Sequence, residues 1–378
     1  MARLPILVLL ALFCVITNDL IGVDMRNYTV LLHGEVLTRA DAYRTKLLQG
    51  AKPGANLAKA LQGCDLAALT PEAFLEKLVQ TKKPMIFAES AVEGNGSDWN
   101  LVELSLLGFV SIAVPVTVFD NGQHEKPEVH KEPFTGTLLF TAGALLDTGS
   151  EDAPPADWDA VTAIGKIDAE AYYRFYEKRL LPVFAYADRL AGEKGRKALI
   201  TVPGIGCGMF AGPFKGLLGQ ELEKTFFRFL HQHARTFKNI RALFYGPFNE
   251  CDNARHEING ITYLVRPFLK GNHTRPQLCH PSFYSEAADD FSDCEFFSIV
   301  AWDHVSWPGN DFYGGTRGTD DGVKAAATSS MFSMTGVEGA YDPETFCYQP
   351  PAGFQNWNQV VAANRLELEV LNRLQVYP

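Results

Sequence analysis

Apolar residues in the first part of the chain recur at helical spacing. Between residues 36 and 81 they fall every three or four positions, in three groups. Pro53-Gly54 separates the first group from the second, and Thr70-Pro71 before the third is a favoured helix start. The pattern predicts an N-terminal helical segment. The residues that carry it are Leu37, Tyr43, Leu47, Leu48, Leu57, Ala60, Leu61, Phe74, Leu75 and Leu78.

Beyond residue 84, short apolar runs alternate with longer segments of helical spacing. The runs predict strands and the longer segments predict helices. This alternation is typical of an α/β fold, so we predict a mixed, mostly parallel sheet flanked by helices. The predicted strands are Met85–Ala88, Ser111–Phe119, Leu138–Ala142, Ala198–Val202, Ile240–Tyr245, Ile261–Val265 and Phe296–Ala301. The predicted helices are Asp168–Leu190, 215–233 and Thr319–Phe332, with a further amphipathic segment at Trp99–Phe109.

The change of pattern near residue 84 divides the chain into two predicted parts. Residues 1–84 form an N-terminal segment with the helical extension, and residues 85–378 form the core. Within the first part, Arg3 precedes an apolar run from Leu4 to Val15. The run is either a signal-like segment over residues 1–22 or a buried strand or helix of the mature fold, and it is short for a transmembrane helix. The polar stretch Gly149–Asp159 predicts a loop in the core.

The predicted strand Ala198–Val202 leads into a loop rich in glycine. The glycines lie at positions 204, 206, 208 and 212, and a helical pattern follows them. This layout holds phosphate groups, because glycines let backbone amides approach an anion and a helix N-terminus adds partial positive charge. The spacing fits neither the dinucleotide fingerprint nor the Walker loop. We predict a site for a phosphate-bearing ligand such as a nucleotide diphosphate. The alternative is a turn without a ligand.

The loop PGIGCGMFAGPF resembles the diphosphate-binding loop of macrodomains, which bind ADP-ribose. Pro203, Ile205 and Phe210 match the family pattern together with three of the glycines. The Asn-Ala-Ala-Asn strand end usual in macrodomains is absent, so we expect a divergent member. The resemblance implies that the loop contacts ADP-ribose. The implied ligand contacts are Pro203, Gly204, Ile205, Gly206, Cys207, Gly208, Met209 and Phe210.

Carboxylates gather in a second segment, AWDHVSWPGNDFYGGTRGTDDGVKAAATSSM. Asp303 follows a predicted strand, Asp311 lies in a loop rich in aromatic residues, and Asp321 lies at the start of a predicted helix. Aromatic side chains can stack on a base or wall a sugar while carboxylates act on it. Each acid also has a structural interpretation: a turn cap for Asp303, an Asx turn for Asp311 and a helix-dipole partner for Asp321. Asp320 is predicted to be the helix N-cap, with Thr319 as its competitor.

The spacing of Asp303, Asp311 and Asp321 resembles the acidic triad of the family of the macrodomain-like bacterial effector MavL, which removes ADP-ribose from arginine of ubiquitin. The resemblance implies that these three are catalytic and that the substrate is an ADP-ribosylated protein, with ubiquitin as one candidate. Hydrolysis of an N-glycosidic bond passes through an oxocarbenium-like cation, which one carboxylate stabilises while another activates water. We assign Asp303 to water or ribose, Asp311 to the guanidinium and Asp321 to either task. Further candidate ligand contacts are Asn249, Trp307 and Asn310.

Composition and charge limit the classes of molecule that the protein is expected to bind. The net charge is −10, from 34 basic and 44 acidic residues, which argues against nucleic acid or an anionic membrane as a partner. Seven scattered cysteines without Cys-x-x-Cys spacing predict free thiols and no zinc site. We expect a monomer with no cofactor and no obligatory metal, although clustered aspartates are also a pattern that binds Mg²⁺. The expected location is the cytoplasm, or outside the cell if the N-terminal run is a signal peptide.

Three other functions stay open at this point. The first is a macrodomain that binds ADP-ribose without catalysing a reaction. The second is a nicotinamide-dependent oxidoreductase that uses the same loop, and the third is a secreted hydrolase of another class. A turnover assay distinguishes the first function from that of a hydrolase, and preferential binding of NAD(H) favours the second. An intact N-terminal run in the mature protein weakens the third. Within the loop, a nucleophilic Cys207 is a minor alternative.

Overall fold

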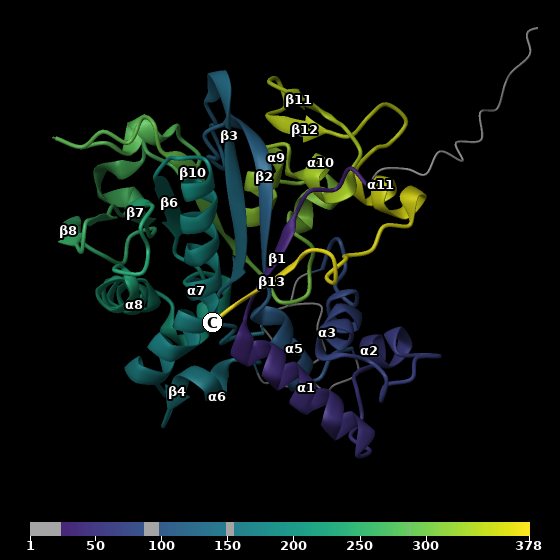
Figure 1. Ribbon diagram of the computed structural model, residues 1–378. Coiled ribbons are helices and arrows are strands. Elements are labelled where there is room, and N and C mark those ends of the chain that lie inside the picture. The colour runs from purple at the N-terminus through teal and green to yellow at the C-terminus, as the bar shows by residue number, and fades with distance from the viewer. Residues whose placement is uncertain (1–23, 87–97, 149–154, 287) are drawn as a thin grey trace, which may run out of the picture.

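Nine strands form one mixed sheet that organises the fold (Figure 1). The computed structural model describes residues 24–86, 98–148, 155–286 and 288–378. The strands are β1 (Thr29–His33), β2 (Ser111–Asp120), β3 (Val129–Ala142), β6 (Ala198–Pro203), β7 (Ile240–Gly246), β8 (Ala254–Ile258), β9 (Ile261–Val265), β10 (Glu295–Trp302) and β13 (Leu374–Tyr377). Their order is β13-β1-β2-β3-β10-β6-β7-β9-β8. Strands β3, β10, β6, β7 and β9 form a parallel block, which confirms the predicted fold class.

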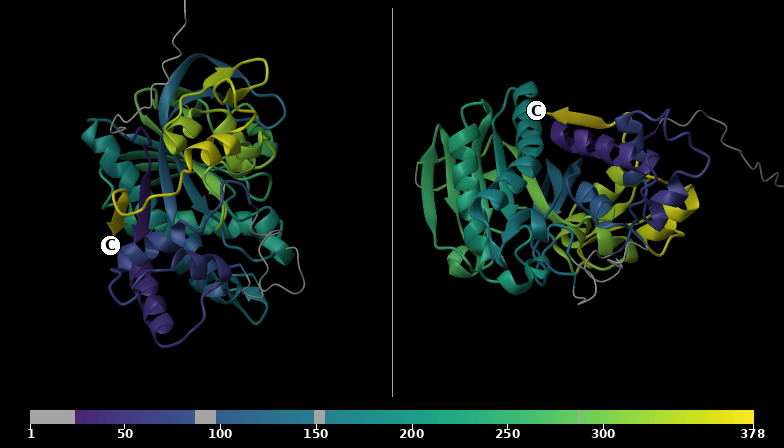
Figure 2. Two further views of the ribbon diagram at one scale, coloured as in Figure 1. Left: turned by 90° about the vertical axis from the view of Figure 1, so that its right-hand side faces the viewer. Right: turned by 90° about the horizontal axis from the view of Figure 1, so that it is seen from below.

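Helices cover both faces of this sheet. Helices α7 (Ala169–Glu193) and α8 (Leu218–His233) lie on one face, and α9 (Asp320–Ala326) and α10 (Ser330–Thr335) lie on the other (Figure 2). Asp168 caps α7 by accepting hydrogen bonds from the next turn, which confirms the predicted long helix. The smaller elements are α6 (Trp158–Val161), β4 (Thr162–Ala163), β5 (Lys166–Ile167), η1 (Met209–Phe214), η2 (Phe268–Asn272), η3 (Pro281–Tyr284), η4 (Asn310–Gly314), β11 (Ala340–Asp342), β12 (Cys347–Gln349) and α11 (Trp357–Asn364).

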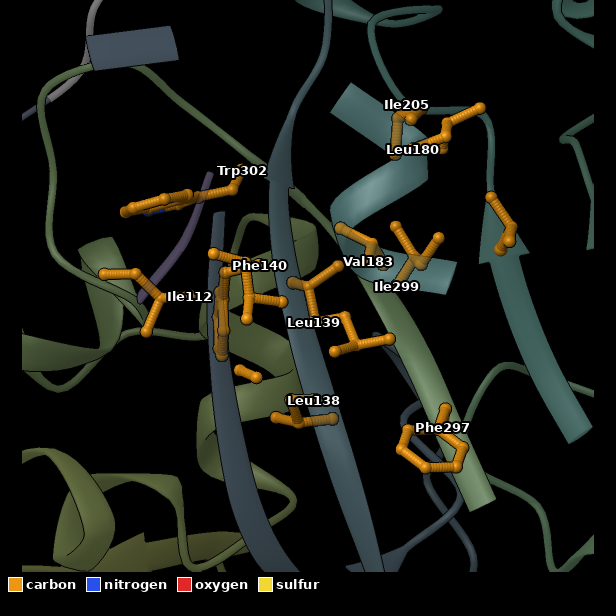
Figure 3. Close-up of a cluster of buried hydrophobic side chains, with 14 of the residues drawn as sticks. Ile112, Leu138, Leu139, Phe140, Leu180, Val183, Ile205, Phe297, Ile299 and Trp302 are labelled. Carbon is orange, nitrogen blue, oxygen red and sulfur yellow. The ribbon is translucent and has the colours of Figure 1, made fainter. Parts of the chain in front are cut away.

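The core lies where the central strands meet α7. Figure 3 shows side chains of β2, β3, β10 and α7 gathered in one cluster, with Ile205 of the glycine loop among them. Successive residues of a strand point to opposite faces, so the apolar run at the end of β3 packs on both. Burial of this apolar surface fixes the ends of the strands, from which the loops of the candidate site emerge. The labelled residues are Ile112, Leu138, Leu139, Phe140, Leu180, Val183, Ile205, Phe297, Ile299 and Trp302.

The N-terminal helices lie at the carboxyl edge of the parallel strands. The predicted helices are present as α1 (Gly34–Leu48), α2 (Ala55–Ala60) and α3 (Pro71–Val79), and the amphipathic segment contains α5 (Leu101–Gly108). The buried carboxylate of Glu103 accepts hydrogen bonds from the amide of Gly54 at 2.9 Å and the hydroxyl of Tyr43 at 2.7 Å, which joins α5 to α1 and to the start of α2. Strand β2 runs antiparallel to β3, so α5, which precedes β2, lies beside the carboxyl end of β3.

Strand β1 and the C-terminal strand β13 were not predicted from the sequence. They pair in parallel with each other, and β1 pairs antiparallel with β2. Residues from the predicted N-terminal segment therefore contribute a strand to the main sheet. The boundary at residues 84 and 85 stays a prediction, and the apolar run Leu4–Val15 lies outside the described residues. Among the helices that the structure does describe, none has the length and apolar character needed to cross a membrane.

Two element predictions are wrong. Met85 and Ile86 are not part of a strand, and the rest of the predicted strand Met85–Ala88 lies outside the described residues. The single predicted helix Thr319–Phe332 is two helices, α9 and α10, with a break at residues 327–329. There the chain pairs with β2: the amide of Phe119 donates to Ala327 O at 2.9 Å and the amide of Ser329 donates to Thr117 O at 3.0 Å. Pairing with the sheet thus interrupts the helix.

Other predictions need their limits changed. Strand β3 begins at Val129, well before the predicted Leu138, and β8 was not predicted. Helix α8 begins at Leu218, after the 3₁₀ helix η1, and not at residue 215. The predicted loop Gly149–Asp159 contains the start of the short helix α6, and its residues 149–154 lie outside the described part. None of these changes moves the strand ends that hold the candidate site.

Candidate active site

The loop after β6 packs tightly against the chain that leaves β3. Gly206 has a φ of 75°, and a Cβ added there would lie 2.7 Å from the Tyr176 hydroxyl oxygen. A Cβ at Gly143 would lie 2.2 Å from the Gly206 nitrogen. The Tyr176 hydroxyl accepts a hydrogen bond from the Ala144 amide at 3.0 Å and donates to Ile205 O at 3.2 Å. The two loops therefore meet backbone to backbone, which only glycine permits at these two positions.

The same loop presents backbone amides without partners. In the described part of the chain, the amides of Gly206, Gly208, Met209 and Phe210 take part in no hydrogen bond of the turns and loops. A Cβ added at Gly208 would meet no atom within 4 Å, and the Met209 side chain is exposed. Successive free amides in a glycine loop form a concave site for an anion. The geometry is thus suited to a diphosphate, as the loop sequence predicts.

Cys207 lies inside this loop with its thiol turned into the protein. The residue is 6% exposed, and Sγ lies 3.6 Å from Ile205 O. Burial raises the pKa of the Cys207 thiol far above its ordinary value. A buried thiol of this kind is a poor nucleophile, because the thiolate is the reactive form. The geometry therefore gives no support to a nucleophilic Cys207.

An ion-pair cluster of Asp157, Arg179 and His304 lies under these loops. Nη2 of Arg179 donates to Oδ2 of Asp157 at 3.0 Å, and Nε2 of His304 lies 2.8 Å from the same oxygen. Nη1 of Arg179 donates at 2.7 Å to both Ala142 O and Gly143 O at the end of β3. Burial alone would raise the pKa of Asp157, but Arg179 and His304 hold it below its ordinary value. The cluster joins the ends of β3 and β10.

His304 also connects the glycine loop with the acidic segment. It directly follows Asp303, and its ring centroid lies 5.8 Å from that of Phe210. Burial lowers the pKa of His304, although Asp157 opposes this shift. The ring is wholly buried, so His304 serves as a packing and hydrogen-bonding link between the two predicted halves of the site.

Asp303, the first residue after β10, is held by its own loop. Oδ1 accepts hydrogen bonds from the amides of Val305 and Ser306, both at 2.7 Å, and Oδ2 accepts one from the side-chain amide of Asn310 at 2.9 Å. The predicted turn cap is therefore present. These donors compensate the charge of a nearly buried carboxylate and fix its position at the end of β10. The catalytic role of Asp303 stays a prediction.

Asp311 ties η4 to the start of α9. Oδ2 accepts hydrogen bonds from the amides of Gly318 at 2.6 Å and Thr319 at 3.2 Å, and the Thr316 hydroxyl lies 3.2 Å from it. Oδ1 is bonded to the Thr319 hydroxyl. A Cβ at Gly322 would lie 1.8 Å from Oδ1, so only glycine leaves room for this carboxylate. Both oxygens of Asp311 are therefore engaged by its own chain.

Asp321 differs from the other two acids because it has few partners. Its side chain is buried, Oδ1 lies 2.6 Å from the Thr319 hydroxyl oxygen, and Oδ2 has no hydrogen-bond partner among the described residues. Burial raises the pKa of Asp321 well above its ordinary value, and the nearby carboxylates of Asp303 and Asp311 raise it further. Asp303, Asp311 and Asp321 thus form one electrostatically coupled group, which we name the acid cluster.

The N-cap prediction for Asp320 is wrong. Thr319 is the N-cap of α9, since its hydroxyl oxygen accepts a hydrogen bond from the Gly322 amide at 3.1 Å. Asp320 instead accepts one from the Ala301 amide at 2.8 Å and pairs with the buried Lys324 ammonium at 2.8 Å. These contacts fasten α9 to β10 and so place the acid cluster against the sheet edge.

A segment that the sequence did not connect with the site holds the acidic loop in place. The amide of Lys83 donates to Val305 O at 2.9 Å, and the amide of Trp307 donates to Lys83 O at 2.8 Å. The Trp307 indole donates to Lys82 O at 2.9 Å. The chain after α3 therefore pairs with the loop after β10. A short polar stretch after a helix gives no sequence signal for this contact.

Lys82 is the most unusual residue of this segment. Its ammonium donates to His304 O at 2.6 Å and lies 4.1 Å from the ring centroid of Trp302. Burial lowers the pKa of Lys82 to about 7, although the nearby carboxylate of Asp303 opposes the shift. The side chain lies between the ion-pair cluster and the acid cluster, and no sequence pattern marked it.

The other predicted ligand contacts lie in different surroundings. Asn249 is exposed after β7, and its backbone amide donates a hydrogen bond to the carboxylate of Glu250 at 3.0 Å. Trp307 is buried with its indole N–H engaged, and Asn310 is buried and accepts a hydrogen bond from the Ile86 amide at 3.1 Å. The loop and the acid cluster come together, whereas Asn249 has no described contact with the acids. Ligand binding by these three residues stays a prediction.

Two surface cavities lie away from the acid cluster. One, of about 460 Å³, is lined by residues of α1, α5 and α7 such as Arg39, Arg174 and Lys178. The other, of about 480 Å³, lies beside α8 and is lined by Phe227, Cys251 and others. Their walls mix paired charges and apolar surface and hold none of the predicted site residues. In the ranges that the structure describes, no group of three His, Cys, Asp or Glu side chains is arranged to hold a metal ion.

A mixed sheet with a parallel block, flanked by helices and carrying an amide-rich glycine loop at the carboxyl strand ends, defines a macrodomain-like protein. The family model of the macrodomain effector MavL matches residues 28–354. The chain therefore belongs to the MavL macrodomain effector family, and the predicted resemblance is confirmed. The match includes β1, the glycine loop and the acid cluster. A search of the curated proteins finds no match to this chain. Membership of a macrodomain family makes ADP-ribose the expected class of ligand.

Proposed function

We propose that this protein binds ADP-ribose on the glycine loop and hydrolyses the bond between ADP-ribose and an arginine of a modified protein, with ubiquitin as one candidate target. The observation that carries the proposal is the placement of three coupled carboxyl groups, Asp303, Asp311 and Asp321, at the same sheet edge as the free amides of the loop. Ligands of open α/β sheets bind at this edge.

Binding relies on local groups, because the protein as a whole is acidic. The diphosphate accepts hydrogen bonds from the amides of Gly206, Gly208, Met209 and Phe210, which have no partners in the loop itself. Phe210 packs against His304, so a ligand on the loop lies next to the residue that follows Asp303. The distal ribose is then directed to the acid cluster.

The reaction needs an acid that protonates the leaving guanidine and a base that accepts a proton from the attacking water. The bond between C1″ of the ribose and the guanidine nitrogen breaks, and its electron pair stays on nitrogen. A proton from Asp321 passes to that nitrogen as it departs. Water adds its oxygen to C1″ and gives its proton to Asp303, whose charge also stabilises the oxocarbenium-like transition state. The proton returns from Asp303 to Asp321 through solvent, so the cycle balances.

The hydrogen bonds favour a different division of roles from the one that the sequence indicated. Asp311 has both oxygens engaged, and its Oδ1 lies directly against Gly322, whereas Oδ2 of Asp303 accepts a single hydrogen bond, from Asn310. Asp311 is therefore better suited to hold the site together than to bind a guanidinium. Asp321 has an oxygen without a partner among the described residues and a raised pKa, which suits an acid at neutral pH. We therefore give the leaving guanidine to Asp321.

The decisive experiment measures ADP-ribose released from arginine-ADP-ribosylated ubiquitin by the purified protein. We expect release by the wild type, strong loss in Asp321→Asn, and full activity in Asp252→Asn, which changes an exposed aspartate outside the site. Substrates with ester-linked or serine-linked ADP-ribose test the linkage. Release from these alone would overturn the arginine assignment.

A second candidate is an ADP-ribose reader without chemistry. It is favoured by the engagement of Asp303 and Asp311 with their own loops, which leaves few acidic oxygens free. Calorimetry with free ADP-ribose separates the two functions. Binding without release from any linkage would favour the reader, and absence of binding would overturn both.

A further inference from the structure

Thr319 lies between two carboxyl groups of the acid cluster. Its hydroxyl oxygen is bonded to Oδ1 of Asp311 and lies 2.6 Å from Oδ1 of Asp321. It also accepts a hydrogen bond from the Gly322 amide at 3.1 Å. A threonine hydroxyl carries one proton, so it can donate to only one of the two carboxyl oxygens. The other contact needs a proton from the carboxyl group.

The surroundings of the two acids decide where that extra proton lies. The amides of Gly318 and Thr319 donate to Asp311, so its negative charge is compensated without the threonine hydroxyl. Asp321 accepts no amide hydrogen bond, and its Oδ2 has no partner in the described part of the chain. Burial of an isolated carboxylate costs far more free energy than burial of the neutral acid. The proton therefore belongs on Asp321.

We propose that Thr319 is a positioning residue that accepts a hydrogen bond from protonated Asp321 and donates its own proton to ionised Asp311. This assignment satisfies every contact of the hydroxyl: it accepts from the Gly322 amide and from Asp321, and it donates to Asp311. Thr319 thereby keeps the carboxyl group of Asp321 protonated until the leaving guanidine nitrogen of the substrate takes the proton. The catalytic part rests on the proposed function, but the place of the proton does not.

The groups around Asp321 are consistent with this arrangement. The titratable groups that face it are Asp303 after β10, Asp311 and the Tyr313 phenol in η4, and Asp320 on its own helix. None of these is a cation. A hydroxyl that donated to Asp321 would favour its ionised form, but the single hydroxyl proton is engaged by Asp311. Removing the hydroxyl costs the protonated state three hydrogen bonds and the ionised state two, since only the contact with Asp321 depends on the proton.

The test follows aspartate carboxyl carbons by NMR during a pH titration, in the full chain and without substrate. In the wild type we expect one aspartate to stay protonated at neutral pH, and its signal to be missing in Asp321→Asn. Thr319→Val keeps the shape but lacks the hydroxyl, so the midpoint of Asp321 falls by about one pH unit, equivalent to one net neutral hydrogen bond. Thr319→Ser keeps the wild-type midpoint.

Thr319 is also a helix N-cap, so a matched control is needed. Thr70→Val removes the N-cap of α3, where the Thr70 hydroxyl accepts from the Ala73 amide at 3.2 Å, far along the chain from the acid cluster. It lowers the melting temperature as Thr319→Val does but leaves the Asp321 midpoint unchanged. If Thr319→Val does not fold, the wild type and Asp321→Asn still locate the proton.

Three outcomes would overturn the inference. They are a wild type with no protonated aspartate at neutral pH, a protonated signal that persists in Asp321→Asn, and a Thr319→Val midpoint equal to that of Thr70→Val. Since no substrate is present, these results are distinguishable from a failure of the proposed function. If the protein hydrolyses ADP-ribosyl-arginine, the high-pH limb of kcat falls at lower pH in Thr319→Val by the same shift.

Discussion

The protein buries two clusters of charge at one sheet edge, and they are built in opposite ways. In the ion-pair cluster, the charge of Asp157 is compensated by the Arg179 guanidinium, and Nε2 of His304 lies 2.8 Å from the same carboxylate oxygen. In the acid cluster, three carboxyl groups lie close together, and burial, with the neighbouring carboxylates as a further cause, raises the pKa of Asp321. Compensated charges hold loops in position, whereas neighbouring carboxyl groups keep one of their number protonated, which lowers stability. The comparison separates the part that supports the site from the part suited to chemistry.

The largest effect is expected when the ion-pair cluster is broken. Asp157→Ala leaves the buried guanidinium of Arg179 without its carboxylate, which costs about 3–5 kcal/mol of unfolding free energy. Denaturant unfolding measures this loss. Asp159→Ala, at an exposed position of the short helix α6 that Asp157 precedes, is the matched control and should change stability by less than about 0.5 kcal/mol. Similar losses in both variants would show that the ion-pair cluster is not special.

Breaking the acid cluster should have the opposite effect on stability. If Asp321 is the acid of the proposed reaction, Asp321→Asn lowers the hydrolytic rate by about 10²-fold or more. Because the folded pKa of Asp321 lies above its unfolded value, the folded state retains a proton that the unfolded state loses, and stability falls as pH rises above about 4. The variant lacks this loss. Thermal unfolding at acidic and neutral pH should show it more stable than the wild type only at neutral pH.

Lys82 lies between the two clusters and is a buried cation without a carboxylate in direct contact among the described residues. Its folded pKa of about 7 is below the unfolded value of 10.5, so the unfolded state binds more protons between these limits. Stability therefore rises with pH from about 7 to about 10, by at most about 1.4 kcal/mol per pH unit. Lys82→Met should remove this rise and stabilise the protein near neutral pH. The exposed Lys52→Met is the control, and an unchanged pH profile in Lys82→Met would contradict the prediction.

The smallest effect concerns the loop alone. Gly208 has room for a methyl group, because an added Cβ would meet no atom within 4 Å, so Gly208→Ala should fold. If the diphosphate lies on this loop, the methyl group hinders its approach and weakens ADP-ribose binding by about tenfold, or about 1.4 kcal/mol. Gly34→Ala, which also has room but lies at the start of α1, should bind normally. Isothermal titration calorimetry measures the ADP-ribose affinity of both variants. Equal affinities would show that the ligand does not lie on this loop.

Much of the fold and part of the site could be predicted from local sequence. The strand, glycine loop and helix around Gly206 follow from apolar periodicity and glycine spacing, which depend on neighbours in the chain. The acids were found because Asp303, Asp311 and Asp321 lie close together in sequence. The break between α9 and α10 was missed because pairing with β2, more than 200 residues earlier in the chain, outweighs helix propensity there.

Local patterns along the chain are enough to predict which residue types lie at the strand ends: an amide-rich loop and three aspartates. How these residues differ from one another depends on the folded protein. It buried Lys82 and His304 beneath the loops, engaged both oxygens of Asp311, and left Asp321 with a single hydroxyl partner among the described residues. The physical reason is that burial and charge coupling depend on distances between segments remote in the chain, and these distances decide which acid keeps its proton.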